Sequence, residues 1–99
     1  MSYRVRILRR AQADLLEIHR YLTRDSEAQA RSAIEGLLRA IDSLQEQPMR
    51  GVAPRDARLR SQGYRFLVVG QHLVFYKVRG RLVRVYRIVH GRRQYADIL

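Results

Sequence analysis

The sequence predicts a single α+β domain over residues 1–99, with the element order β-α-α-β-β-β and an antiparallel sheet that carries a helical hairpin on one face. Three patterns lead to this prediction: an alternating segment at the N-terminus, two segments of helical periodicity joined by a short turn, and three short apolar runs separated by glycine turns. Because 46% of the 99 residues are hydrophobic, the chain can fill one core. We expect the sheet face away from the helices to stay partly open and to serve as the binding surface.

The N-terminal half is predicted to form one strand and two helices. Residues 3–8 alternate between apolar side chains and arginine, which is the period of a half-buried strand. Residues 11–24 then space their apolar side chains along one face of a helix, formed by Ala11, Leu15, Ile18 and Leu22. Ser26, with Gln29 three residues later, fits the capping box of a second helix, which Pro48 ends.

The C-terminal half is predicted to supply the rest of the sheet. Residues 49–63 show no periodicity and contain glycine and proline, so we expect a surface loop there. Residues 64–69, 72–78 and 82–90 are β-rich runs separated by short glycine-containing turns, which predicts a three-stranded meander.

Positive charge is concentrated in this second half. Between Ala57 and Ala96 the chain carries ten of its 20 cations and none of its nine acids, whereas the remainder is close to neutral. Such one-sided charge suggests a polyanion or an acidic protein as partner. Arginine accounts for 19 of the 20 cations, which a GC-rich genome would also produce, but that bias does not explain the missing acids.

Several classes of site are excluded or disfavoured by composition. The chain has no cysteine, and its three histidines, His19, His72 and His90, lack the spacing of metal ligands, so we expect neither a metal nor a cofactor. No apolar stretch approaches the roughly twenty residues that span a bilayer, and the N-terminus has no apolar signal core. We therefore expect a cytoplasmic protein with no membrane partner.

Five segments together resemble a known family. They are Ala11-x-Ala13-Asp14-Leu15-x-x-Ile18-x-x-Tyr21, Gln47-Pro48-Met49-x-Gly51, Leu59-Arg60-x-x-Gly63-Tyr64-Arg65, Gly70-x-His72-x-Val74-Phe75-Tyr76-x-Val78 and Val83-x-Val85-x-Arg87-Ile88-Val89-His90-Gly91-Arg92-Arg93. Each segment alone is ordinary patterning. In this order and register, which covers nearly the whole chain, the set resembles the RelE/ParE superfamily of toxins from bacterial toxin–antitoxin modules.

The resemblance implies one of two activities. RelE-like members are ribosome-dependent mRNA endoribonucleases, whereas ParE-like members act on DNA gyrase without hydrolytic chemistry of their own. Of six positions in the RelE pattern, only Arg65 and Arg93 keep their charge, since the others carry Leu67, Val69, Leu73 and Leu99. The resemblance thus favours a ParE-like toxin with no catalytic residues. If cleavage were retained, Arg65, His90 and Arg93 would carry it.

The C-terminal segment 91–99 and the basic sheet edge are expected to contact the target through Arg87, His90, Arg92, Arg93 and Tyr95. Strict alternation would place Arg87 on an apolar face, so either the strand bulges or Arg87 projects into an open groove; we favour the groove. His90 either lies beside a bound phosphate or bonds the backbone at a strand end, and we favour the backbone bond.

The resemblance also implies a cognate ParD-like antitoxin and a toxin–antitoxin hetero-oligomer. An acidic antitoxin segment that folds on binding would lay a helix along the apolar face of Leu15, Ile18 and Leu22. Its acids would meet ionic anchors at Arg60, Arg65, Arg87 and Arg93. A third possibility is a basic nucleic-acid-binding module, although the glycine-aromatic signature of RNA-binding sheets is missing.

Overall fold

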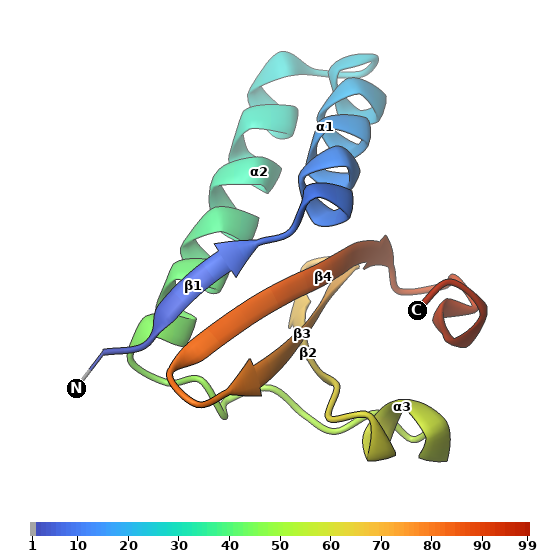
Figure 1. Cartoon of the computed structure of the whole chain (residues 1–99). Helices are drawn as coiled ribbons and strands as arrows, with labels where there is room; N and C mark the ends of the chain where they lie inside the picture. The colour runs from blue at the N-terminus through green and yellow to red at the C-terminus, as the bar shows by residue number, and fades with distance from the viewer. Residues whose placement is uncertain (1) are drawn as a thin grey trace.

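The computed structural model describes residues 2–99. Two long helices pack as a hairpin against one face of a four-stranded sheet, while a short helix and the C-terminal turn lie away from them (Figure 1). In chain order the elements are β1 Arg4–Ile7, α1 Arg9–Thr23, α2 Glu27–Asp42, η1 Ser43–Gln45, α3 Ala57–Ser61, β2 Arg65–Val69, β3 His72–Arg79, β4 Leu82–His90 and η2 Tyr95–Asp97. The predicted α+β class and element order are confirmed.

The helical hairpin forms where the local signals placed it. The hydroxyl of Ser26 caps α2 by accepting a hydrogen bond from the Gln29 N–H at 3.2 Å, as the capping box predicted. α2 passes into the 3₁₀ turn η1 and the chain then leaves the helical path before Pro48. No helix within residues 2–99 is long and apolar enough to cross a membrane.

The sheet order is β1-β4-β3-β2, and the last three strands form the predicted antiparallel meander. β1 differs because it pairs with β4 in the parallel direction, from Arg4 opposite Leu82 to Ile7 opposite Val85. The chain direction explains this pairing. The helical hairpin and the loop return the chain to the end of the sheet where β1 began, so β2 runs with β1, and two further reversals align β4 as well.

The sheet separates two apolar clusters. The cluster under the helices is the larger one and consists of Ala11, Leu37, Ile41, Leu44, Leu67, Val74, Tyr76, Val83, Val85 and Ile88. The second cluster lies on the opposite face and consists of Leu59, Tyr64, Leu73, Phe75 and Val89. Burial of apolar surface stabilises by about 25 cal/mol per Å², so both faces of the central strands contribute to stability.

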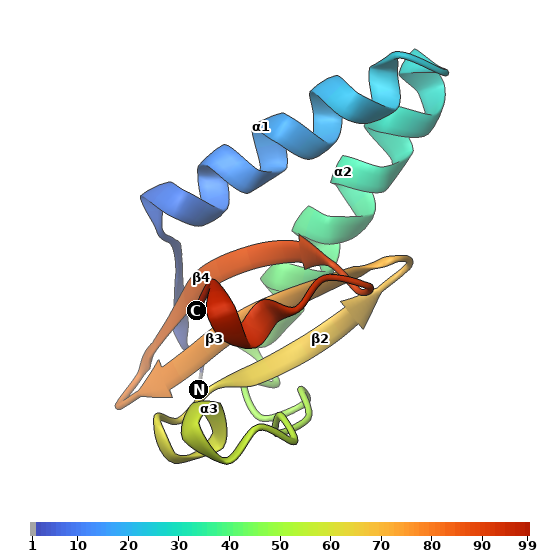
Figure 2. The same ribbon diagram turned by 90° about the vertical axis from the view of Figure 1, so that its right-hand side faces the viewer.

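The C-terminal segment covers much of the face that was predicted to stay open. Figure 2 shows this segment in front of the middle of the sheet. The Tyr95 ring packs against Phe75 with centroids 4.8 Å apart, and Ile98 and Leu99 pack on the same cluster. This cover keeps the apolar surface of the second cluster away from water, which stabilises the fold. On this face, only the two ends of the strands therefore stay open.

The predicted loop is held by one buried tyrosine and contains the short helix α3. The Tyr76 hydroxyl accepts a hydrogen bond from the Gly51 N–H at 2.9 Å and donates one to the Pro48 carbonyl at 2.8 Å. A Cβ atom at Gly51 would lie 2.5 Å from this hydroxyl, so only glycine fits there. Asp56 caps α3 by accepting a hydrogen bond from the Leu59 N–H at 3.0 Å.

Candidate functional site

A buried ion pair joins α1 to the free edge of β4. Asp14 is 4% exposed, and its two carboxylate oxygens accept hydrogen bonds from Arg87 Nε at 2.8 Å and from Arg87 Nη2 at 3.1 Å. Asp14 Oδ2 also accepts the backbone N–H of Ile88 at 2.8 Å. β1 stops pairing with β4 at Val85, and Asp14 thus satisfies a strand edge that β1 leaves uncovered.

The prediction that Arg87 projects into an open groove is wrong. The β3–β4 register shifts between Phe75 and Tyr76, so the strand bulges and strict alternation does not hold there. The bulge was the alternative to the groove in the sequence analysis. Arg87 is 7% exposed, and its Nη1 donates to the Ile98 carbonyl at 3.2 Å. The hydrogen bond to Asp14 raises the pKa of Arg87, and burial opposes this only in part. Arg87 therefore positions the C-terminal segment and is not available as a free cation.

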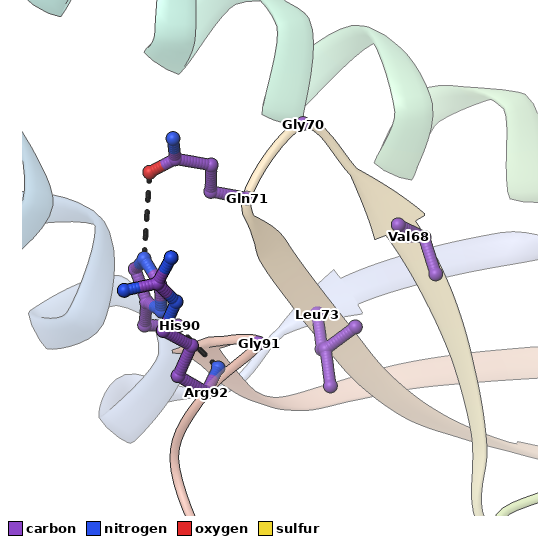
Figure 3. Close-up of a pocket in the computed structure, with 7 residues that line it drawn as sticks. All are labelled: Val68, Gly70, Gln71, Leu73, His90, Gly91 and Arg92. Atoms are coloured by element: carbon purple, nitrogen blue, oxygen red, sulfur yellow. Dashed lines mark hydrogen bonds between the residues drawn. The ribbon is translucent and has the colours of Figure 1, made fainter.

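His90 lies at the rim of a hollow at the end of the sheet (Figure 3). Its Nδ1 accepts the Arg92 N–H at 3.2 Å, and its Nε2 lies 3.4 Å from Gln71 Oε1. These contacts match the favoured backbone interpretation of His90. The hollow measures about 330 Å³ and is lined by Val68, Gly70, Gln71, Leu73, His90, Gly91 and Arg92.

His72 lies next to His90, and their ring centroids are 5.9 Å apart. Burial lowers the pKa of His72, and the nearby His90 lowers it further. Burial and the neighbouring His90 thus favour the neutral form of His72 at neutral pH. This pairing follows from the strand register, which places the two residues opposite each other on β3 and β4.

Arg60 and Arg65 use their guanidinium groups to hold the loop. Arg65 Nη1 donates to the Gly51 carbonyl at 2.8 Å, and Arg60 Nη1 donates to the carbonyls of Pro54 at 3.1 Å and Arg55 at 2.9 Å. Sequence reasoning treated both arginines as free ionic anchors. The structure gives each of them an internal partner, since loop carbonyls without a ladder need donors.

The three residues proposed for RelE-like cleavage do not come together. Arg65 pairs with Tyr76, whereas His90 pairs with His72, which lies four residues before Tyr76 on β3. At about 3.3 Å per residue, the two positions are separated by about 13 Å along the strands. Arg93 follows His90 in an exposed turn, at the opposite end of the sheet from Arg65. Within residues 2–99, no group of three His, Asp or Glu side chains could hold a metal ion.

The helical hairpin carries an apolar hollow of about 540 Å³ between α1 and α2. It is lined by Arg9, Gln12, Ala13, Leu15, Leu16, His19 and Ile34. Leu15 and Ile18 both pack against the main core, but only Leu15 lines this hollow, and Leu22 lines a separate one beside Gly36. The three predicted leucine and isoleucine positions therefore do not form one groove. Leu16, which is 53% exposed, was missed. The adjacent Leu15-Leu16 pair was its signal, because neighbouring residues cannot both face one core.

The comparison with protein-family models identifies one family. The model of the family described as "ParE toxin of type II toxin-antitoxin system, parDE" matches residues 5–95. No curated protein matches the chain.

Two solved structures share the fold. One is the chromosomal ParDE TA system from P. aeruginosa, with a TM-score of 0.73 and 21% identity, covering 90% of this chain and 96% of that chain. The other is the toxin–antitoxin complex RelBE2 from Mycobacterium tuberculosis, with a TM-score of 0.64 and 21% identity, covering 91% of this chain and 99% of that chain.

Proposed function

The chain belongs to the ParE toxin family of type II toxin–antitoxin systems, and on that basis we propose that it arrests growth by acting on DNA gyrase until a ParD-like antitoxin neutralises it. The observation that carries this proposal is the family match over residues 5–95. The distance between Arg65 and His90 supports a non-catalytic mode, because phosphate cleavage needs cations and a proton-transfer group around one reacting centre.

The proposed target surface is the exposed start of the C-terminal segment. Arg92 and Arg93 are exposed, and they follow His90 at the rim of the hollow shown in Figure 3. Tyr95 is half-buried against Phe75, so it anchors the segment on the sheet. The predicted roles of Arg92 and Arg93 as contacts remain predictions, while Tyr95 and Arg87 act by positioning them.

The proposed antitoxin surface is the apolar hollow on the helical hairpin. The apolar face of an amphipathic helix could pack on the side chains of Leu15, Leu16 and Ile34, which line the hollow. Arg9 also lines the hollow and offers a cation to an acidic side chain of that helix. This surface lies on the other side of the sheet from the C-terminal segment, so an extended antitoxin would have to wrap around the domain to reach Arg93. The result would be a toxin–antitoxin hetero-oligomer.

The test is to assay the purified toxin for inhibition of supercoiling by gyrase and for mRNA cleavage on ribosomes, with the same preparation. Inhibition of supercoiling with intact mRNA is expected. The charge-reversal variant R92E/R93E should weaken this inhibition, whereas R31E/R39E, with the same change of net charge on the exposed side of α2, should not. Codon-phased mRNA cleavage with unaffected gyrase would overturn the proposal in favour of the RelE-like activity.

A further inference from the structure

Five cations occupy one end of the sheet on the face away from the helices. Val5, Ile7, Val83 and Val85 pack toward the helical core, so the residues between them point to the opposite face. The strand register aligns the cations in two rows that cross β1, β4 and β3. One row is Arg6, Arg84 and Lys77, and the other is Arg4, Leu82 and Arg79. We call the five cations the cationic patch.

The cationic patch has no acidic partner. None of the nine Asp and Glu residues lies on a strand, and within residues 2–99 the one ion pair is that of Asp14 with Arg87. Lys77 instead places its Nζ over the rings of Tyr64 and Tyr86, at 4.4 Å and 5.0 Å from their centroids.

Like charges directly opposite each other on neighbouring strands destabilise a sheet. Arg84 lies opposite Arg6 on one side and opposite Lys77 on the other, so two like-charge pairs in this row destabilise the folded sheet. The C-terminal segment, which covers the middle of this face, leaves the β3–β4 hairpin end beyond it (Figure 2). A bound anion would remove the repulsion, which makes this end of the sheet a candidate binding surface.

We propose that the cationic patch binds the phosphate backbone of duplex DNA. The centres of protein–protein interfaces are depleted of charged residues, whereas protein–DNA interfaces are strongly positive, and the only apolar residue in the two rows is the half-buried Leu82. Adjacent strands lie about 4.8 Å apart, so each row spans about 10 Å, which is about the rise of three base pairs.

The proposed contact reads phosphates and not bases. Stacking of bases needs free aromatic faces, but Tyr64 is 7% exposed and packs edge-on against Tyr86 at 5.4 Å between centroids. Binding should therefore be independent of sequence and should weaken steeply with salt. This inference goes beyond the action on gyrase and is tested without gyrase, so either proposal can fail alone.

The test measures fluorescence anisotropy of a short labelled duplex DNA titrated with the purified toxin at several salt concentrations. In the patch variant R4Q/R6Q/R84Q, affinity should fall by at least about tenfold, and the slope of log K against log salt should become shallower by about 2.7 if each arginine contacts one phosphate. The matched variant R20Q/R31Q/R39Q removes three exposed arginines from the helices and has the same net charge, so its affinity should stay within about twofold of the wild type.

Three results would overturn the proposal. One is an equal loss in both variants, which would mean that only net charge matters. Another is the absence of DNA binding at physiological salt by the wild type. The third is tight binding of polyglutamate, with the same sensitivity to the patch variant, which would assign the surface to an acidic protein. Thermal melting tests the like-charge repulsion without any ligand. R84T removes two like-charge pairs and should therefore raise Tm by up to about 5 °C.

Discussion

Replacing Asp14 by alanine should destabilise the domain strongly, because the change leaves a buried guanidinium without its counter-ion. Removing one partner of a buried ion pair costs about 3–5 kcal/mol, and Asp14 also satisfies the Ile88 N–H. A domain of this size has roughly 5–15 kcal/mol of total stability, so D14A should consume a large part of it. For a domain of up to about 100 residues, 1 kcal/mol corresponds to about 4–8 °C in Tm, which predicts a drop of about 12–40 °C.

The assay is urea and thermal unfolding followed by far-UV circular dichroism, since the chain has no tryptophan. The exposed acid Glu35 on α2 provides the control, and E35A should change stability by less than about 0.5 kcal/mol. The double variant D14L/R87M removes both charges and should recover part of the loss, with a remaining cost of about 1–3 kcal/mol from the unpaired Ile88 N–H. A cost below about 1 kcal/mol for D14A would refute the claim that this pair holds α1 to β4.

Three further changes test the packing around the site. G51A should cost about 1–3 kcal/mol, seen as a lower urea midpoint, because its Cβ would press on the Tyr76 hydroxyl; unchanged stability would contradict the close approach. Y95A should cost about 1–2 kcal/mol by exposing Phe75, and the same unfolding assay checks it. His72 has a pKa below its ordinary 6.5, so protons bind the unfolded chain preferentially: stability is complete above pH 6.5 and declines as the pH falls through the lower folded pKa. The variant H72Q should lose this part of the pH dependence in unfolding measured between pH 7.5 and 5, and an identical pH profile would show that His72 is not its source.

The elements that the sequence predicted well are those with local causes. The Ser26 cap acts on a residue three positions away, and the hairpin turns need glycine at positive φ, as at Gly70 and Gly80. Such signals are complete within a few residues, so they could be read without the fold. The parallel pairing of β1 with β4 joins residues about 80 positions apart, and no local pattern encodes it.

The site was harder to predict because its residues are paired by the fold. Arg87 was expected to need an acidic partner from outside, and the partner is Asp14, 73 positions earlier in the chain. Asp14 lies outside the apolar positions that predicted the first helix, so no local pattern indicated that it is buried. Its position on the buried side of α1 becomes visible only when β4 is placed beside that helix. The cover of the second apolar cluster by Tyr95, Ile98 and Leu99 depends in the same way on a turn after β4.

Four arginines of the basic half have internal hydrogen-bond partners, which limits what a substitution there can report about a bound protein. Arg58, Arg60, Arg65 and Arg87 donate to backbone carbonyls of the loop or of the C-terminal segment. These carbonyls lie outside the sheet ladder, and arginine, with five donors and a charge that is never lost, can satisfy them. Charge reversal at Arg65 would therefore disturb the Gly51 turn as well as any antitoxin contact, so a weakened complex would not identify an ionic anchor. Arg93 donates only its backbone N–H among the hydrogen bonds within residues 2–99, which makes it the position where a loss of binding reports on the partner.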